Sequence, residues 1–267
     1  MSNDVMWRLA TFIGVLLLMM ALEALFPRRS RAQFRQGRWV TNLSLVVINS
    51  LFLKLLGPVT AVIAAGYAVD QGWGLLRILP VELPIYLEIV AGVVLLDFAI
   101  YLQHVASHKI PIIWRLHKVH HVDRDIDVTT GIRFHPIESV LSMVYKCIVI
   151  LLLGPIALSV IVFEIILNAS AMFNHANFSI PHKVDTVLRK VVVTPDFHRV
   201  HHSVHVKETN SNYGFFLTIW DRLGNTYTTQ PKDTHRDMTI GLSEYQIPHT
   251  ASLWWCLVLP FKKTSKR

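Results

Sequence analysis

Residues 85–108 read IYLEIVAGVVLLDFAIYLQHVASH, an apolar run that ends in a pair of histidines. The part from 85 to 103 has close to the ~20 residues that an α-helix needs to cross a bilayer. His104 and His108 follow at a spacing of four, which places both imidazoles on one face of a helix. We therefore expect a membrane span whose last turns carry two candidate metal ligands.

The composition of the whole chain is that of an integral membrane protein. Of its 267 residues, 52% are hydrophobic and 16% are charged, and the mean hydropathy is +0.41. Soluble domains ordinarily have about 25% charged residues. The net charge of +8 does not indicate nucleic-acid binding, because Lys and Arg are spread along loops, and a membrane-facing basic surface accounts for it. The two cysteines, Cys147 and Cys256, are far apart and predict neither a disulfide nor a metal site.

Three other regions are apolar enough to enter a membrane. Residues 7–26 predict one span, in preference to a signal peptide, because no small-residue cleavage site follows them. Residues 39–67 contain a break at Gly57-Pro58 and predict either one kinked span or a helix pair. Residues 140–173 are divided at Gly154-Pro155 and are long enough for a helical hairpin.

The charges between these regions predict an orientation. Residues 27–38, PRRSRAQFRQGR, contain five arginines and no acid, which places this loop in the cytoplasm and the N-terminus outside. The span at 85–103 then returns to the cytoplasm at His104, and the hairpin brings His175 to the same side. Residues 252–267, SLWWCLVLPFKKTSKR, are short for a span and predict a cytoplasmic interfacial anchor.

The histidines are concentrated in one part of the chain. Twelve of the 14 lie between positions 104 and 205, and none is in the middle of a predicted span. The segments HKVHH (117–121) and HRVHH (198–202) repeat one spacing, which again gathers imidazoles on a helix face. With the HVASH pair and the histidine of FNHAN, nine imidazoles from four segments can converge, enough for two metal ions. They are His104, His108, His117, His120, His121, His175, His198, His201 and His202.

The ligand types narrow the choice of metal without settling it. Structural zinc and iron–sulfur sites are disfavoured because cysteine pairs are absent from the sequence, and the HExxH pattern of zinc proteases is absent too. Haem would require single histidines inside opposing spans, whereas these lie at span ends. Imidazole suits iron, copper and zinc alike. A dinuclear histidine site beside a bilayer is suited to oxygen chemistry on lipid C–H bonds.

Other residues are secondary candidates. His135, in RFHPIE, precedes a proline and is expected either to cap the next helix or to act in or beside the metal site. Asp97 lies seven residues before His104, on the same helical face, and an acid inside a span favours a functional role. Asp97, Asp196 and Asp221 are candidates to accept the free N–H of a ligand imidazole, although ordinary capping or surface roles suit Asp196 and Asp221 equally well. The remaining histidines are expected at the surface: His182, His205, His235 and His249.

Six motifs occur in order along the chain: DFAIYLQHVASH (97–108), WRLHKVHH (114–121), RFHPIE (133–138), HAN (175–177), TPDFHRVHHS (194–203) and NYGFFLTIWDRLGNTY (212–227). Together they resemble the fatty acid hydroxylase and sterol desaturase superfamily of membrane di-iron enzymes, over roughly residues 97–226. The resemblance implies a four-helix membrane bundle with a cytosolic histidine-rich lobe, two irons, dioxygen as co-substrate and an electron donor. It also implies that the nine histidines named above are the ligands.

The sequence departs from that family in two ways. Some members carry a fused cytochrome-like module, and this chain has no segment resembling one, so a separate ferredoxin- or cytochrome-type protein is expected to supply electrons. Some members have a further histidine four residues after the one matching His175, where Ser179 stands here. The ligand count, nine or ten, therefore stays open, with His135 or His182 as substitutes and Asn177 as another candidate near the metals. Zinc is expected to replace iron in some purified samples.

The expected fold is an all-α integral membrane protein, a transmembrane bundle of about four spans, some as hairpins, with a cytosolic histidine-rich helical cap. We expect N-terminal membrane helices in 1–84, the di-iron domain in 85–230 and an interfacial tail in 231–267. The expected activity is hydroxylation or desaturation of a sterol-like, fatty acyl or related lipid that enters from the bilayer. The alternatives are a membrane protein that binds or transports divalent metals, and a binding protein with a degenerate site.

Overall fold

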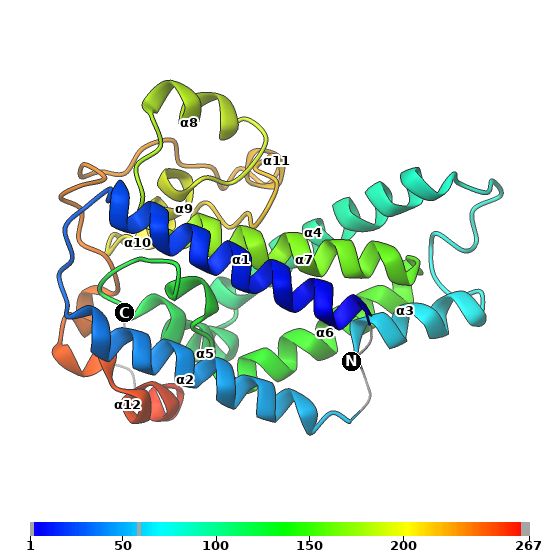
Figure 1. Ribbon diagram of the computed structural model, residues 1–267, viewed down its shortest axis with the longest axis horizontal. Coiled ribbons are helices and arrows are strands. Elements are labelled where there is room, and N and C mark those ends of the chain that lie inside the picture. Colours follow the sequence, from blue (N-terminus) through cyan, green and yellow to red (C-terminus); the bar gives the residue numbers. More distant parts are fainter. Residues whose placement is uncertain (1–2, 58–59, 263–267) are drawn as a thin grey trace.

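The computed structural model describes residues 3–57 and 60–262, which contain helices and no β-strand, as expected for an all-α protein. Four of these helices are long and apolar enough to cross a membrane (Figure 1). The four are α1 (Asn3–Leu25), α4 (Ile85–Lys109), α6 (Pro136–Leu153) and α7 (Ala157–His175). The multi-pass membrane bundle predicted from hydropathy is therefore confirmed.

Helix α7 is the centre of the bundle. It packs against α1, α4 and the short helix α3 (Ala61–Asp70), and α6 packs against α3 and α4. Helices α4 and α7 approach closely at Gly92, where an added Cβ would lie 2.6 Å from the Cβ of Ser159. Small residues allow this approach, and close packing replaces the hydrophobic effect as the force that associates helices inside lipid.

The region 39–67 forms a helix pair. Helix α2 (Arg35–Lys54) ends shortly before Gly57, which has φ of +66°, and α3 begins again at Ala61, while Pro58 falls outside the described residues. The buried side of α2 carries polar residues, including Arg38, Asn42 and Asn49. This explains why α2 lacks the hydropathy of the four spans: it packs against polar segments as well as against α6.

The helical hairpin predicted at Gly154-Pro155 is present. Gly154 ends α6 in the left-handed conformation, with φ of +65°, and α7 starts three residues later. The loop before α4 closes this end of the bundle, because the backbone N–H of Leu75 donates to the carbonyl of Leu152 at 2.9 Å. Arg77 donates to the Gly154 carbonyl at 2.9 Å.

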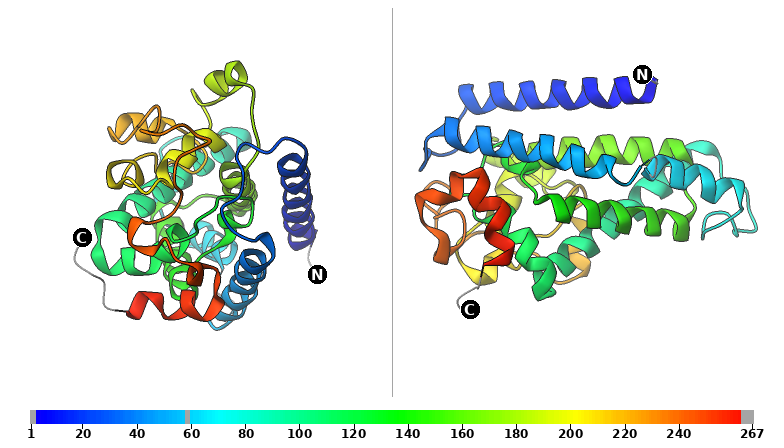
Figure 2. Two further views of the ribbon diagram at one scale, coloured as in Figure 1. Left: turned by 90° about the vertical axis from the view of Figure 1, so that its left-hand side faces the viewer. Right: turned by 90° about the horizontal axis from the view of Figure 1, so that it is seen from below.

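A lobe of short helices lies at the opposite end, where α1, α4 and α7 finish and α2 begins (Figures 1 and 2). Its elements are α5 (Pro111–His121), η1 (Thr130–Ile132), α8 (His182–Leu188), α9 (Pro195–His201), α10 (Val206–Thr209) and α11 (Ile219–Leu223). Ion pairs, buried at Arg38 and partly buried at Arg28, attach the arginine-rich loop (residues 27–38) to this lobe. Arg38 contacts Asp123 and Asp127 at 2.7 Å each, and Arg28 contacts Asp196 at 2.8 Å.

The C-terminal segment packs on the same lobe. It comprises η2 (Ser243–Tyr245), η3 (Pro248–Ala251), α12 (Leu253–Val258) and η4 (Leu259–Phe261), which lie against α2 and α5. Cys256 and Leu259 are fully buried in a cluster with Leu45 and Val119, whereas Trp254 is exposed. One face of this segment therefore completes the hydrophobic core beneath the histidine-bearing helix α5.

Candidate metal centre

The nine histidines selected from the sequence meet in two adjacent groups. Within each group the candidate ligand atoms all lie within 4.8 Å of one another. All nine are buried except His108, which is partly exposed. Group one contains His104, His108, His117, His121 and His201, and group two contains His120, His175, His198 and His202.

The repeated HxxHH spacing divides each motif between the two groups. In the motif on α5, His117 and His121 belong to group one and His120 to group two. The motif formed by α9 and the residue after it does the reverse, because its first and last histidines belong to group two and its middle one, His201, to group one. Each motif thus presents an i, i+4 pair to one group and a single imidazole to the other, which explains why the spacing occurs twice.

Hydrogen bonds on the Nδ1 atoms orient several rings. The Nδ1 atoms of His104 and His201 lie 2.7 Å from the carbonyl oxygens of Tyr213 and Ser211, and that of His175 lies 2.6 Å from the Ala171 carbonyl. A carbonyl oxygen can only accept, so each of these Nδ1 atoms carries the proton. The Nε2 atom then keeps its lone pair, which is the arrangement of a metal-bound histidine.

In group two the Nε2 atoms lie close to one another. The Nε2 atom of His175 lies 3.1 Å from the Nε2 atoms of His120, His198 and His202. The Nδ1 atom of His120 lies 3.2 Å from the Arg133 carbonyl oxygen and therefore carries the proton, as does Nδ1 of His175. Neither neutral ring then has a proton on Nε2 to donate to the other. Ligands held about 2.0–2.1 Å from one cation lie about 3.0–3.4 Å apart, so this spacing fits a shared ion.

Group one has the same character. The Nε2 atoms of His104, His117, His121 and His201 are buried and have no hydrogen-bond partner among the residues that the structure describes. Buried polar atoms are normally paired, because leaving one unpaired costs about 1–3 kcal/mol. Four unpaired imidazole nitrogens in a group whose candidate ligand atoms lie within 4.8 Å of one another therefore fit a second cation.

The surroundings of His120, His201 and His202 favour the neutral form that binds metals. Burial, together with the neighbouring imidazoles, lowers the pKa of His120 and of His202 well below the ordinary histidine value. Burial likewise lowers the pKa of His201 to about 3. Neutral imidazoles need no deprotonation before they bind a cation.

The three aspartates act on backbone and side chains around the site rather than on an imidazole directly. Asp97 accepts hydrogen bonds from the backbone N–H groups of Phe216 and Leu217, at 3.2 and 3.1 Å, and from the indole N–H of Trp220 at 2.7 Å. Asp97 thereby joins α4 to α11 and to the residues just before it. This differs from the expected bond to a ligand imidazole.

Asp221 supports a ligand through one intermediate group. It accepts from the backbone N–H groups of Tyr213 and Gly214 at 2.8 and 2.7 Å, and the Tyr213 carbonyl holds His104. Burial raises the pKa of Asp221 to about 6, although the hydrogen bonds that this carboxylate accepts lower the pKa in part. Asp196 instead pairs with Arg28 and Arg199.

The other secondary candidates lie outside the two groups. His135 caps α6, because its Nδ1 accepts from the Ile137 N–H at 3.2 Å, and His182 is exposed at the start of α8. The Asn177 side chain donates to the Arg29 carbonyl at 3.0 Å. His235, expected at the surface, is instead buried beside Asp196, at 3.9 Å, because the chain after α11 folds back over α9.

Glu138 contacts the site but was not among the candidate residues named from the sequence. Its Oε1 atom lies 2.6 Å from Nδ1 of His117, in the first turn of α6. Its Oε2 atom is buried without a hydrogen-bond partner in the described part of the chain. The motif RFHPIE contained the signal, since Glu138 follows His135 by three residues at a helix start. A carboxylate on the outer nitrogen of a ligand histidine fixes its tautomer and raises its basicity.

Removal of this carboxylate is expected to weaken metal binding at group one. We expect Glu138→Ala to lower the metal affinity by about 10–100-fold, as for other carboxylates behind ligand histidines. Glu138→Gln keeps an acceptor oxygen and is expected to lose less. Competition of the purified protein against a chelator measures both effects, and equal affinity in Glu138→Ala and the unchanged protein would contradict this role.

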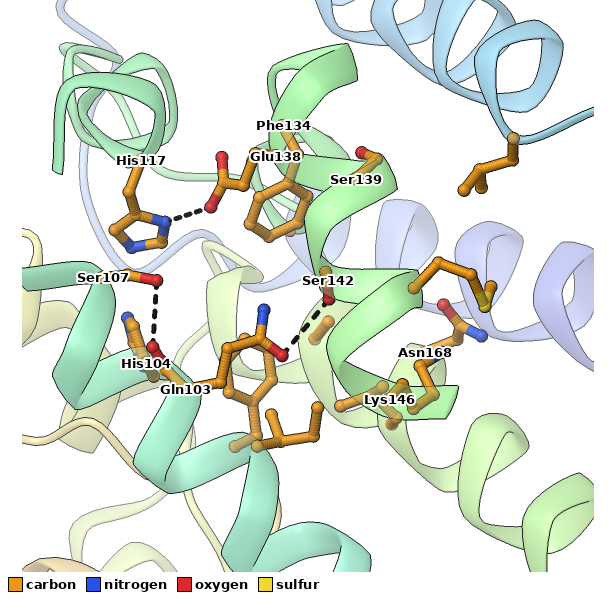
Figure 3. Close-up of a pocket in the computed structure, with 17 residues that line it drawn as sticks. Gln103, His104, Ser107, His117, Phe134, Glu138, Ser139, Ser142, Lys146 and Asn168 are labelled. Carbon is orange, nitrogen blue, oxygen red and sulfur yellow. Dashed lines mark hydrogen bonds and ion pairs between the residues drawn. The ribbon is translucent and has the colours of Figure 1, made fainter. Parts of the chain in front are cut away.

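A cavity of about 210 Å³ opens beside group one, between α4, α6 and α7 (Figure 3). His104, His117 and Glu138 line one end of it, and Leu53 of α2 lines another part. Its apolar walls include Ile100, Met143, Leu167 and Phe215. The cavity lies among the spans, so an apolar molecule can lie in it beside the imidazoles.

The structure is thus a bundle of apolar, span-length helices with nine imidazoles, eight of them buried, in two groups that could each hold a metal ion. The family model described as fatty acid hydroxylase matches residues 89–226, and the chain belongs to this family. No solved structure matches the chain.

Several curated proteins are similar to the chain over about half of its length. Ornithine lipid hydroxylase OlsE of Rhizobium tropici is 31% identical over 60% of this chain and 48% of its own. Alkylglycerol monooxygenase of Caenorhabditis elegans is 31% identical over 51% of this chain and 26% of its own. Delta(7)-sterol 5(6)-desaturase erg3B of Aspergillus fumigatus is 28% identical over 55% of this chain and 41% of its own. The chain thus spans half or less of the length of these relatives.

Proposed function

We propose that the protein is a membrane di-iron oxygenase that hydroxylates, or alternatively desaturates, an unactivated C–H bond of a lipid. The observation that carries the proposal is the convergence of buried imidazoles in two groups beside a cavity among the spans. In one group the Nε2 atoms of three histidines lie 3.1 Å from that of His175. The named activities of the similar proteins, lipid hydroxylation, alkylglycerol monooxygenation and sterol desaturation, support the same class of reaction.

The overall reaction balances with dioxygen and an external reductant. Hydroxylation takes one lipid C–H bond, O2, two electrons and two protons to a C–OH group and water. Desaturation takes two C–H bonds and the same reagents to a C=C bond and two waters. Iron bound by the nine histidines would supply the reductive activation of dioxygen. We propose a separate ferredoxin- or cytochrome-type protein as the electron donor.

The residues of the chain would bind, orient and exclude water. The walls formed by Ile100, Met143 and Phe215 would hold a hydrocarbon segment against His104 and His117. Glu138 would keep the proton of His117 on Nδ1. The buried lobe would exclude bulk water from the imidazoles, which suppresses side reactions of reactive species.

We also propose that the lobe and the C-terminus are cytoplasmic and the N-terminus is outside. The arginine-rich loop at 27–38 lies at the same end as the histidines, through Arg28 and Arg38, and such loops remain in the cytoplasm. In this proposal residues 85–230 form the catalytic unit, with 1–84 and 231–267 packed around it. A C-terminal reporter that is active only in the cytoplasm tests the orientation.

Metal analysis and lipid mass spectrometry together test the proposed function. We expect the purified protein to contain about two irons per chain, one for each histidine group, and to consume oxygen when reduced. Cells that express it should contain a lipid with the mass change of one added oxygen or of two lost hydrogens, and cells that express His120→Ala should lack that lipid.

Two other results would favour the alternatives. Zinc movement across vesicles without oxygen consumption would indicate a metal transporter. Unchanged lipid profiles with His120→Ala and His201→Ala would indicate a binding protein. Either result would overturn the proposed oxygenase activity.

A further inference from the structure

The far end of the cavity is polar, although it lies inside the bundle. Lys146 and Asn168 line it there, away from His104 and His117 (Figure 3). Lys146 follows Glu138 by eight residues on α6, which places it about 12 Å further along the helix. Ionisable residues inside membrane spans are costly and usually mark functional positions.

The charges at this end do not cancel. Glu164 of α7 accepts from Lys146 at 2.8 Å through Oε1 and from Arg8 of α1 at 2.5 Å through Oε2. Two cations thus share one carboxylate, which leaves one excess positive charge. The side chains of Lys146 and Glu164 are 11% and 5% exposed, whereas that of Arg8 is 34% exposed, so Lys146 is the cation with less access to the surface. An excess buried charge is unfavourable unless an ion of opposite sign accompanies it.

The groups that face the cavity can donate to such an ion. An ammonium has three N–H donors, and Glu164, which does not line the cavity, takes one of those of Lys146. The side-chain amide of Asn168 donates one N–H to the backbone carbonyl of Glu164 at 2.8 Å, and its second N–H is available to a ligand. Ser142, on the same face of α6, donates to Gln103 at 3.3 Å and adds a polar wall.

We propose that Lys146 and Asn168 bind the acidic group of a single-chain lipid, with its hydrocarbon chain extended along the cavity toward His104 and His117. This inference rests on the proposed function and specifies its substrate class as a lipid acid, carboxylate or phosphate. The oxidised carbon then lies on the order of 12 Å from the acidic group, a separation set by the rise along α6. A plain hydrocarbon or a neutral ester would lack the anion that this site requires.

A purely structural role for Lys146 predicts a different pattern of variants. If the ion pair with Glu164 served only to join α6 and α7, replacing Lys146 or replacing Glu164 would change lipid-acid binding by a similar amount. If Lys146 binds an anion, Lys146→Met removes the attraction, whereas Glu164→Gln releases the ammonium from its internal partner. The two variants should then change lipid-acid binding in opposite directions.

Equilibrium binding of radiolabelled stearic acid to the detergent-purified full-length protein tests the proposal. We expect Lys146→Met to weaken binding by about 10–100-fold, the loss expected for charge-assisted hydrogen bonds. We expect Lys146→Arg to retain most of the affinity, Asn168→Leu to weaken binding and Glu164→Gln to bind as tightly as the parent or more tightly. Lys54→Met is the matched control, because Lys54 is exposed at the end of α2 and does not line the cavity.

Two further ligands identify what is recognised. Methyl stearate should compete at least about 10-fold less well than stearic acid, and lysophosphatidic acid distinguishes a phosphate from a carboxylate source. Equal competition by methyl stearate would overturn the proposal, as would equal losses in Lys146→Met and Glu164→Gln with matched thermal unfolding. Metal content and oxygen consumption of the same samples are measured separately, so a failure of the oxygenase activity is distinguishable from a failure of this site.

Discussion

Replacement of His175 with alanine is expected to empty group two and abolish turnover. His175 is the central residue of that group, since its Nε2 atom lies 3.1 Å from each of the other three. We expect the iron content to fall from about two to about one per chain. We expect the activity to fall by more than about 100-fold, which exceeds the loss usual for a residue that only hydrogen-bonds to a metal ligand. Elemental analysis and oxygen uptake on the same preparation measure both.

The control for this prediction is His182→Ala. His182 was a substitute ligand in the sequence analysis, but it lies exposed at the start of α8, outside both groups. We expect this variant to keep the iron content and activity of the parent. Retention of two irons by His175→Ala, or loss of one by His182→Ala, would contradict the assignment of group two.

Replacement of Arg38 with methionine is expected to produce the largest loss of stability. The Arg38 side chain is 0% exposed and pairs with Asp123 and Asp127, and it also donates to the Thr130 hydroxyl at 3.2 Å. Burial opposes ionisation of Asp127, but the charge of Arg38 still lowers its pKa to about 2. Removal of the guanidinium would leave two buried carboxylates uncompensated, which costs about 3–5 kcal/mol. Thermal unfolding in detergent, followed by tryptophan fluorescence, measures the change.

Arg35→Met is the matched control for Arg38→Met. Arg35 is on the same helix, one turn earlier, and its guanidinium is partly exposed over the ring of Trp39 at 3.8 Å. Such an exposed contact contributes about 0.5–1 kcal/mol. Similar melting temperatures for the two variants would show that Arg38 does not hold the arginine-rich loop to the lobe.

The arginine-rich loop carries the charges that predict the membrane orientation, and two of its arginines also form ion pairs with the lobe. Its composition predicted only which side of the membrane it occupies. The structure uses Arg38 and Arg28 as ion-pair partners of Asp123, Asp127 and Asp196, on segments adjacent to the histidine motifs. These ion pairs therefore join the start of α2 and the loop before it to the segments that carry the candidate metal centre.

Local patterns in the sequence were sufficient to select the spans and the histidines that gather in the two groups. Hydropathy selected α1, α4 and the hairpin of α6 and α7, because a helix inside lipid must satisfy its backbone polar groups internally and present apolar side chains outward. Histidine spacing selected the nine imidazoles, because residues three or four apart share one helix face. Both are short-range properties that can be counted along the chain.

Only the tertiary structure decided how the histidines divide and what supports them. The division of each HxxHH motif between two groups depends on how α5 packs against α4 and how α9 packs against α7. Three supporting contacts join residues that are at least 18 positions apart in the sequence. They are His117 with Glu138, His104 with the Tyr213 carbonyl, and Lys146 with Glu164. Such contacts depend on packing between elements, which no local spacing encodes. The N–H groups that donate to Asp97 and Asp221 therefore could not be assigned before the fold was known.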